Sequence, residues 1–547
     1  MNVGALPDQI ALTDDLRDIA KQPATHQSAF LERLCSVQAA TSYGSAHGFA
    51  DIEDMECWRR NVPVMFESDL RSLAQRMLKG DSQILVNDDV LAWNRTSGTT
   101  GEPKLIPVTQ RNRLERGAFK RRWHAQSRML LPGQGKLTSI NLLNMYVHES
   151  GVGVRLEAGQ PPVRAATSGL AKGYNPWIPE CCYRIDDYDA RYEMLMRFMA
   201  GRSLRRMIII NPSTLVLFER LLHRRYESMV RDIADGTIAD DLPIDVLSRQ
   251  ELNAALPAMP DVARDMDAAK SLGTLHMSTL LPTLEGIGCW RSGGVVHFSD
   301  RLGELYGVDR VMDLGYHASE GLFSIPVTTH DAGTLLDTVN TLVEFLPADD
   351  APPEPGSCPE TIGPDALEVG KRYWTICSGF NGLYRWWMND IIDVVDFVEQ
   401  TPRIRFLCKG GRMNSTTGEK MDEYHVAAAA SRIGAAEGIA IDGVAAAVCL
   451  EGDLPHYVVA LESDVQDGSR LSVAFDEALK DINPEYRFHR GRGAVEPVQI
   501  IAVAPGRFEA WRRSRIDQGA SEAQVKPPGL FKDITELRCA FLRDRWD

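Results

Sequence analysis

The sequence predicts an α/β protein, with a large N-terminal domain of parallel and mixed sheets and a small α+β domain at the C-terminus. Three observations lead to this prediction. Strand-like apolar runs alternate with helical patterns between residues 206 and 316, which favours parallel pairing. β-rich runs follow at 371–377 and 391–397, which favours antiparallel pairing. A glycine-rich segment at 410–415 precedes a second helix–strand pattern, so we expect domains at 1–410 and 411–547.

The N-terminal quarter is expected to be mainly helical. Apolar residues recur at helical spacing over 13–40 and again over 70–78, and residues 41–49 between them are rich in turn-forming types. Residues 110–130 carry seven Lys or Arg side chains. This basic run is either a wall that steers anions or a solvated helix face whose aliphatic stems cover the core, and the second interpretation is favoured.

The middle of the chain and the C-terminal domain supply the remaining elements. The run 206–210 reads as a short buried strand, after which Ser213 is expected to cap a helix over 214–231. Further strands are expected at 280–290, 310–316, 342–346, 371–377 and 391–397, and a surface loop at 349–364. The C-terminal domain is expected to contain helices at 421–433 and 471–482 and strands at 444–450, 456–461 and 498–503.

Composition limits the class of function. The chain has 547 residues, 44% of them hydrophobic, and a net charge of −15, which fits a large globular core and argues against nucleic acid as a partner. No run reaches the roughly 18 consecutive apolar residues of a membrane span, and the first ten residues lack the basic start of a signal peptide. Ten cysteines without a Cys-x-x-Cys pair indicate reduced thiols. We therefore expect a cytoplasmic monomer without a membrane partner.

One stretch carries the strongest functional signal, Ser97-Gly98-Thr99-Thr100-Gly101-Glu102-Pro103-Lys104. Its glycines can adopt positive φ and let backbone N–H groups approach phosphate oxygens, while three hydroxyls donate hydrogen bonds and Lys104 adds a positive charge. It is not a Walker loop, because Pro103 precedes the lysine. A polar hairpin turn is the simpler alternative, but the density of donors between two apolar runs favours phosphate binding.

Two acidic residues accompany predicted strands. Glu320, in the segment that follows strand 310–314, lies where open α/β sheets bind ligands and can ligate Mg²⁺, while Tyr316 in the same segment can lie against a flat base. A solvent-exposed turn explains this segment equally well. Asp390 ends the aromatic run that starts at Tyr384 and can accept hydrogen bonds from ribose hydroxyls, whereas Trp386 is expected in the core.

These motifs, in their order along the chain, resemble those of the auxin-responsive acyl acid amido synthetases (the Gretchen Hagen three family), within the adenylate-forming enzymes. The series comprises the phosphate loop, Tyr-x-x-Ser-Glu at 316–320, Tyr-Arg-x₄-Asp at 384–390 and Gly411-Arg412. The first two motifs belong to the wider superfamily, which also contains acyl-CoA ligases. The tail from Gly506 to Pro527 is specific to the amido synthetases.

The resemblance implies a large ATP-binding domain and a small lid that swivels between two half-reactions. It implies ATP and Mg²⁺ as cofactors, a carboxylic acid as substrate, and an amino acid or other amine that receives the adenylated acid as an amide. By motif position, the implied nucleotide-binding residues are Ser97, Gly98, Thr99, Thr100, Gly101, Lys104, Tyr316, Ser319, Asp390 and Arg412. The implied catalytic residues are Glu320, which is also the metal ligand, Lys526 and, as the second lysine candidate, Lys420.

The chain departs from the family pattern at three positions. Trp387 replaces the second arginine of the third motif, Asn389 replaces its glycine, and His317 stands where a small residue is usual. A strand of period two would place Arg385 on the same face as Trp387, where its guanidinium could partly replace the lost charge.

Two other functions stay open. An acyl-CoA ligase would form the same adenylate and pass the acid to CoA. A catalytically silent nucleotide-binding protein is also compatible with Trp387 and Asn389. Acid-dependent exchange of pyrophosphate into ATP would separate the silent protein from both enzymes.

Overall fold

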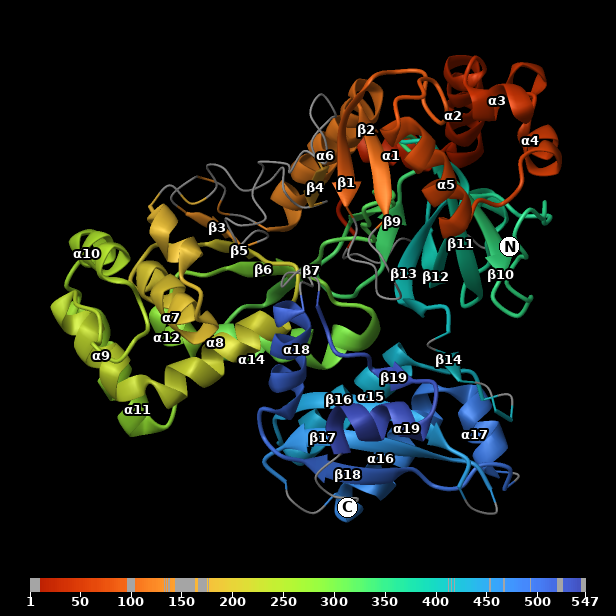
Figure 1. Ribbon diagram of the computed structural model, residues 1–547. Helices are drawn as coiled ribbons and strands as arrows, with labels where there is room; N and C mark the ends of the chain where they lie inside the picture. Colours follow the sequence, from red (N-terminus) through yellow and green to blue (C-terminus); the bar gives the residue numbers. More distant parts are fainter. Residues whose placement is uncertain are drawn as a thin grey trace.

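The computed structural model places a body formed by residues before 412 against a smaller C-terminal part (Figure 1). In Figure 1 the C-terminal part is blue, and it lies next to both the antiparallel sheet and the helices around the parallel sheet. The structure describes residues 10–95, 104–131, 133, 135, 138–142, 163–165, 175, 177–411, 413–414, 416–417, 419–451, 454–465, 468–491, 493–518 and 525–542. None of the helices in these ranges is both long and apolar enough to cross a membrane.

A parallel sheet of four strands forms one half of the body, as the alternating pattern predicts. The strand order is β3-β5-β6-β7, and every neighbouring pair is parallel. The strands are β3 (Ser139–Asn141), β5 (Arg206–Ile208), β6 (Gly286–Cys289) and β7 (Arg310–Asp313). The strand expected at 280–290 starts only at Gly286, because α12 (Met277–Leu280) precedes it.

Helices surround this sheet and share one apolar core with it. They are α7 (Tyr188–Met199), α8 (Ser213–Arg224), α9 (Tyr226–Asp235), α10 (Val246–Ala255), α11 (Pro260–Leu272), α13 (Val296–Ser299) and α14 (Leu302–Tyr306). The single helix expected over 214–231 is wrong, since α8 and α9 meet at Arg225, whose guanidinium pairs with Glu193 at 3.0 Å. The expected cap at Ser213 is also wrong: Asn211 Oδ1 accepts from the Ser213 N–H at 3.1 Å.

An antiparallel sheet of six strands forms the other half, in the order β10-β11-β12-β13-β9-β8. Its strands are β8 (Ser324–Pro326), β9 (Thr334–Leu336), β10 (Leu342–Pro347), β11 (Arg372–Gly379), β12 (Leu383–Val398) and β13 (Thr401–Lys409). Antiparallel pairing is confirmed throughout. β12 is longer than the strand expected at 391–397, so Tyr384 to Asp390 lie inside it.

The N-terminal elements cover this second sheet. They are α1 (Asp14–Ala20), α2 (Pro23–Gln38), α3 (Ser42–Ala46), α4 (Met55–Asn61), α5 (Glu67–Leu78), β1 (Val90–Arg95), β2 (Leu105–Thr109), α6 (Gln110–Leu130) and β4 (Val163–Ala165). Pro23 starts a new helix, so the pattern over 13–40 forms two helices. The turn-rich segment at 41–49 contains a short helix, because Thr41 Oγ1 accepts the Gly44 N–H at 2.9 Å and caps it.

The C-terminal part is a mixed four-stranded sheet with helices on both faces, in agreement with the α+β prediction. Its sheet order is β18-β17-β16-β19. Helices α15 and α16 share one core with the sheet, and α18 and α19 share another. The elements are β14 (Met413–Asn414), β15 (Met421–Asp422), α15 (Glu423–Glu437), β16 (Ile441–Cys449), β17 (His456–Ser463), α16 (Ser469–Ile482), α17 (Pro484–Gly491), β18 (Gln499–Val503), α18 (Arg507–Asp517), β19 (Leu530–Phe531) and α19 (Ile534–Leu537).

Candidate active site

The turn after β7 brings the second motif over the antiparallel sheet. Gly315 has φ +96°, and a Cβ there would lie 2.3 Å from the Ser324 carbonyl oxygen, so this position requires glycine. The Gly315 N–H donates to Asp313 Oδ1 at 2.7 Å, which fixes the turn. Burial raises the pKa of Asp313 to about 6.

Tyr316 and Asp390 form the centre of the candidate site. The Tyr316 hydroxyl donates to Asp390 Oδ2 at 2.5 Å, and Lys409 Nζ donates to Asp390 Oδ1 at 2.7 Å. The Tyr316 ring stacks on Phe323 and Phe406, with centroid distances of 4.6 and 5.8 Å. Burial, followed by the charge of Asp390, raises the pKa of Tyr316 well above its usual range, so the phenol remains the donor.

Glu320 and Lys104 bring the first and second motifs together. Lys104 Nζ lies 3.8 Å from Glu320 Oε1, 3.7 Å from Glu67 Oε2 and 5.2 Å from the ring centroid of Trp386. Asn381 Nδ2 donates to the Glu320 carbonyl oxygen at 2.8 Å and so fixes the backbone there. Ser319 is half-buried in the same turn. The loop residues Ser97, Gly98, Thr99, Thr100 and Gly101 lie outside the described residues.

The two candidate lysines of the C-terminal part lie in different surroundings. Lys526 Nζ is 5.7 Å from the centroid of Phe406, the ring that also stacks on Tyr316, so Lys526 reaches the side-chain group around Asp390. Lys420 instead pairs with Asp349 in the loop after β10. Arg412 lies outside the described residues.

Lys526 also lines a pocket between the body and the C-terminal part. Asn211 Nδ2 donates to the Val525 carbonyl oxygen at 3.4 Å beside this pocket. His297 is 4% exposed there, and burial lowers its pKa to about 3, so it is neutral. The remaining wall comes from α8, from Gly294 and Val295, and from residues 442–444 and 508–512.

Asn389, where the family motif usually has glycine, adopts a backbone conformation that glycine also favours. Its φ is +54°, a left-handed conformation that asparagine tolerates better than most residues. The Gly410 N–H donates to the Asn389 carbonyl oxygen at 2.7 Å, and Asn389 Nδ2 donates to the Gly410 carbonyl oxygen at 3.3 Å. This replacement therefore retains the strand geometry and adds a contact to the segment that joins the two parts.

The expectation that Arg385 compensates for Trp387 is wrong. Arg385 is fully buried with φ +44°, and its guanidinium pairs with Glu344 at 3.2 Å and donates to the Val62 carbonyl oxygen at 3.0 Å. These partners lie in the core, so the charge does not face the site. Trp387 packs on Trp374, with ring centroids 5.1 Å apart.

His317 packs under helix α6, and its ring meets Phe119 edge-on at 5.3 Å. Its Nε2 lies 3.1 Å from the Ser324 carbonyl oxygen, and burial lowers its pKa to about 4, so the ring is neutral near pH 7. Most basic side chains of α6 are exposed to solvent, which agrees with the solvated helix face favoured from the sequence. Arg116 is an exception: burial lowers its pKa, and the charge of Glu320 opposes this shift.

Sequence reasoning missed the roles of two cations near the site. Lys409 pairs with Asp390 because the two residues are opposite each other in the β12–β13 register, which needs the strand pairing to be known. Arg116 precedes Phe119 and Trp123 by three and seven residues, a spacing that places all three on one helix face. That spacing was the available signal for separating Arg116 from the solvated arginines.

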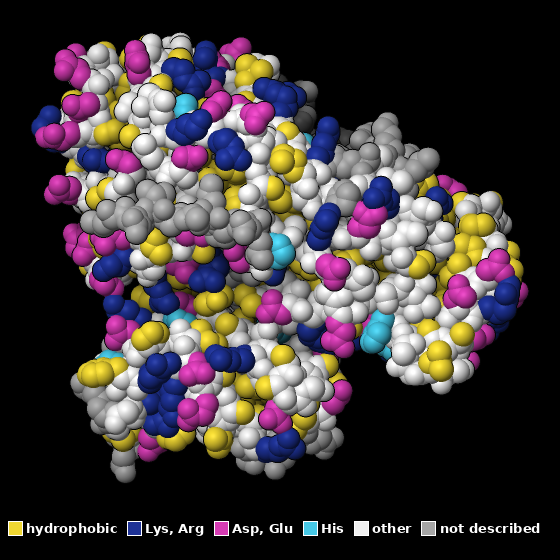
Figure 2. All heavy atoms as spheres, turned by 180° about the vertical axis from the view of Figure 1, so that it is seen from behind, with side chains coloured by type: hydrophobic (Ala, Val, Ile, Leu, Met, Phe, Trp, Pro, Cys, Tyr) yellow, Lys and Arg dark blue, Asp and Glu magenta, His cyan; other side chains and the backbone are white. Residues whose placement is uncertain are grey.

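Ion pairs whose arginines are partly exposed join the body to the C-terminal part. Arg372 pairs with Asp422 at 3.1 Å, Arg301 with Asp442 at 3.2 Å, and Arg513 with Asp189 at 2.7 Å. Arg405 Nη1 donates to the Tyr424 hydroxyl at 3.0 Å. Seen from behind, basic and acidic side chains lie along the boundary between the two parts (Figure 2).

Comparison with known protein families gives matches along most of the chain. The GH3 family N-terminal domain matches residues 12–311, the GH3 family central domain matches 334–409, and the GH3 family C-terminal domain matches 424–534. Among the described residues that the sequence proposed for nucleotide binding or catalysis, Lys104, Asp390 and Lys526 lie within these matches, and Tyr316, Ser319, Glu320 and Lys420 lie between them.

Individual relatives have low sequence identity, but the alignments span most of both chains. Indole-3-acetic acid-amido synthetase GH3.8 of Oryza sativa subsp. indica is 25% identical, covering 93% of this chain and 89% of the relative. Jasmonoyl-L-amino acid synthetase JAR6 of Nicotiana attenuata is 23% identical, covering 95% and 93%.

Solved structures give the same answer for the fold. A GH3.15 acyl acid amido synthetase superposes with a TM-score of 0.76 at 19% identity, covering 98% of this chain and 97% of that chain. A 2-hydroxyisobutyryl-CoA ligase superposes with a TM-score of 0.53 at 12% identity, covering 98% and 96%. The fold is therefore that of the adenylate-forming enzymes, and by its family matches the chain belongs to the GH3 family.

Proposed function

We propose that this protein is an ATP-dependent ligase that adenylates a small carboxylic acid and transfers the acyl group to an amino acid or another amine. One observation carries the proposal: Lys104, Glu320, Tyr316, Asp390 and Lys526, which span more than 400 residues of sequence, converge on one region. The amido synthetase names of the curated relatives support the same activity.

The nucleotide is proposed to bind between the second and third motifs. Asp390 can accept ribose hydroxyls because each carboxylate oxygen has two lone pairs and one is used by Tyr316 or Lys409. Tyr316 and Ser319, in the turn after β7, are proposed to lie next to the base. Lys104, the loop residues Ser97 to Gly101 and Arg412 are proposed to neutralise the phosphates.

Magnesium fits Glu320. Its side chain is 13% exposed, and Lys104, its ion-pair partner among the described residues, lies at 3.8 Å, beyond hydrogen-bond distance, so the carboxylate oxygens can accept a hard cation. A bound Mg²⁺ would balance the negative charge of the triphosphate. The protein itself holds the backbone of Glu320 through Asn381 and keeps Lys104 next to the carboxylate.

The proposed chemistry has two steps. A carboxylate oxygen of the acid attacks the α-phosphorus of ATP, forming an O–P bond and releasing pyrophosphate. The neutral amine then attacks the acyl carbon, AMP leaves with the electrons of the broken C–O bond, and a proton departs from nitrogen. Lys526 is proposed to stabilise the charge of the first step, with Lys420 as the second candidate.

The two steps require different surroundings for the acyl carbonyl. We propose domains at 1–410 and 411–547, with the C-terminal domain rotating about residues 412–414 after adenylation so that the amine gains access and water is excluded. We also propose that the protein acts as a cytoplasmic monomer without nucleic-acid or membrane partners.

A substrate screen tests the proposal. Purified protein with ATP and Mg²⁺ is offered a panel of carboxylic acids against the twenty amino acids, and products are read by mass spectrometry, with a parallel arm that contains CoA. Amide products with stoichiometric AMP are expected. Acyl-CoA in place of amide would identify a CoA ligase, and failure of every acid to support pyrophosphate exchange would contradict both activities.

A further inference from the structure

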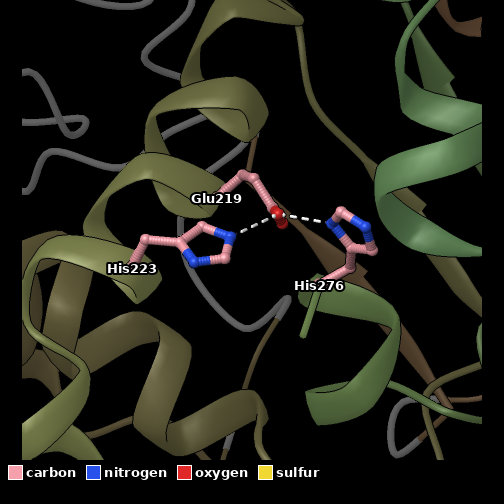
Figure 3. A group of neighbouring side chains, drawn as sticks. All are labelled: Glu219, His223 and His276. Carbon is pink, nitrogen blue, oxygen red and sulfur yellow. Dashed lines mark hydrogen bonds and ion pairs between the residues drawn. The ribbon is translucent and has the colours of Figure 1, made fainter. Parts of the chain in front are cut away.

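Away from the candidate active site, three side chains capable of binding a metal point toward one another (Figure 3). Glu219 and His223 lie one turn apart on α8, and His276 immediately precedes α12. Figure 3 shows both imidazole rings directed at the Glu219 carboxylate, each from a different side. Residues i and i+4 of a helix share a face, which explains how α8 supplies two of the three groups.

The distances are close to those of a metal site. Glu219 Oε1 lies 3.1 Å from His223 Nε2 and 2.7 Å from His276 Nδ1, and the three ligand atoms lie within 4.8 Å of one another. Tetrahedral ligands about 2.0–2.1 Å from Zn²⁺ are about 3.3 Å apart. The two ring nitrogens must approach each other by up to about 1.5 Å, which rotation of two partly exposed side chains permits.

The carboxylate is held in place for this role. Glu219 is 5% exposed, and its second oxygen accepts the Met277 N–H at 2.9 Å, which leaves Oε1 directed at the histidines. Such an outer hydrogen bond orients a metal-binding carboxylate. The side chains of His223 and His276 are 44% and 35% exposed, so an ion and its remaining water ligands can enter from solvent.

We propose that Glu219, His223 and His276 form a binding site for one zinc-type transition-metal ion. Imidazole nitrogens with a single carboxylate suit Zn²⁺, Co²⁺, Ni²⁺ or Cu²⁺, whereas Mg²⁺ prefers oxygen ligands alone. On binding, each facing ring nitrogen presents a lone pair in place of the N–H that it directs at Glu219 Oε1. The site is separate from the magnesium position proposed at Glu320 and does not depend on the proposed ligase activity.

The ion would join α12 to the helix that contacts the C-terminal part. Arg220, next to Glu219 on α8, pairs with Asp442 and lines the pocket that contains Lys526. Asn211, just before α8, bonds to the Val525 carbonyl oxygen. A metal that restrains α8 would therefore restrain one wall of the boundary between the two parts.

Zinc titration of metal-free protein tests the proposal. The affinity for Zn²⁺ is measured by competition with a chromophoric chelator, for the unaltered chain and for His223→Ala and His276→Ala. We expect one equivalent bound in the micromolar range or tighter, and a loss of at least about tenfold in each variant, because each removes one ligand. His330→Ala, which alters an exposed histidine elsewhere, is expected to bind zinc like the unaltered chain.

Two further measurements separate this site from binding elsewhere. Zinc should raise the melting temperature of the unaltered chain more than that of His223→Ala at the same zinc concentration, since stabilisation follows the affinity of the folded state. Co²⁺ should give visible d–d bands without the thiolate charge-transfer absorption that cysteine ligands produce. Equal zinc affinity in all variants, thiolate absorption in the high-affinity complex, or no binding by the unaltered chain would overturn the proposal.

Discussion

The interior around β12 and the boundary with the C-terminal part both contain arginine–carboxylate pairs, but these pairs differ in their exposure to water. In the interior, Arg385 and Glu344 form a fully buried pair, and the guanidinium is further bonded to backbone carbonyls. At the boundary, Arg301 and its partner Asp442 are 24% and 18% exposed, and Arg513 and its partner Asp189 are both 36% exposed. The charges of the interior pair are removed from water and bonded to protein groups, whereas the boundary pairs remain in contact with water.

This difference indicates which region keeps its shape and which can separate. A buried pair is costly to break because an unpaired charge remains in the core. A partly exposed pair exchanges its partner for water at a cost of about 1 kcal/mol or less. The geometry around Asp390 is therefore expected to persist through the reaction, while the C-terminal part can leave and return.

Removing the buried arginine should have the largest effect. Arg385→Leu removes the buried cation 3.2 Å from Glu344, leaves Arg59 at 3.7 Å as the other ion-pair partner of this carboxylate among the described residues, and should lower the free energy of unfolding by about 3–5 kcal/mol, measured by urea denaturation. The control is Arg60→Ala, which removes a surface pair with Glu56 and should cost less than about 0.5 kcal/mol. Equal losses in the two variants would contradict the distinction between interior and boundary.

Removing the charge of Glu320 should affect chemistry and leave folding intact. Glu320→Gln should slow acid-dependent pyrophosphate exchange by about 10³-fold, near 4 kcal/mol, because the carboxylate is proposed to hold Mg²⁺. Glu354→Gln, in the exposed loop after β10, is the matched control and should retain full exchange. Undiminished exchange in Glu320→Gln would count against its metal role.

The two lysines of the C-terminal part should differ in adenylation. Lys526→Ala should slow pyrophosphate exchange by about 10²-fold, since this lysine lies beside Phe406 and the Asp390 group. Lys420→Ala should change exchange by less than about threefold, because its ammonium pairs with Asp349 away from that group. The reverse order would show that Lys420 serves the first step.

Acid should weaken the body and the boundary through neutral histidines, gradually as the pH falls. Burial lowers the pKa of His317, in the body, and of His425, at the boundary, to about 4. The unfolded chain takes up these protons below about pH 6.5, so each histidine should lower stability by about 1.4 kcal/mol per pH unit between pH 6.5 and 4. His317→Gln and His425→Gln should each flatten this dependence in urea titrations.

The two histidines should then be distinguishable. Arg372 Nη2 donates to His425 Nε2 at 2.9 Å, so protonation of His425 removes a bond between the body and the C-terminal part. Limited proteolysis of residues 410–415 should accelerate below pH 6 in the unaltered chain and in His317→Gln. Acceleration that is unchanged in His425→Gln would show that His425 does not control the boundary.

The sequence predicted much of the architecture because its patterns are local. The change from parallel to antiparallel pairing and the separate C-terminal pattern are visible in the spacing of apolar residues, and both agree with the structure. The break at Arg225 was not predictable, because its partner Glu193 is 32 residues away in sequence. The helix at 42–46 was missed because serine and glycine composition outweighed the cap at Thr41.

The motifs predicted most residues of the candidate site. The prediction failed where strand pairing or burial determines the surroundings of a side chain. Tyr316, Asp390, Glu320 and Lys104 were named from the sequence, and the structure brings them together in two contacting pairs. Arg385 was assigned to the wrong surroundings, because its direction depends on the core partner Glu344. The role of Lys409 could be recognised only from the strand register, which places it opposite Asp390.

Pyrophosphate exchange tests the central claim, activation of an acid by ATP at this site, most directly. With a cognate acid found in the screen, labelled pyrophosphate should enter ATP only when that acid is present, and Asp390→Asn should raise the KM for ATP more than it lowers kcat. Exchange that proceeds without any acid, or nucleotide binding unaffected by Asp390→Asn, would contradict the account.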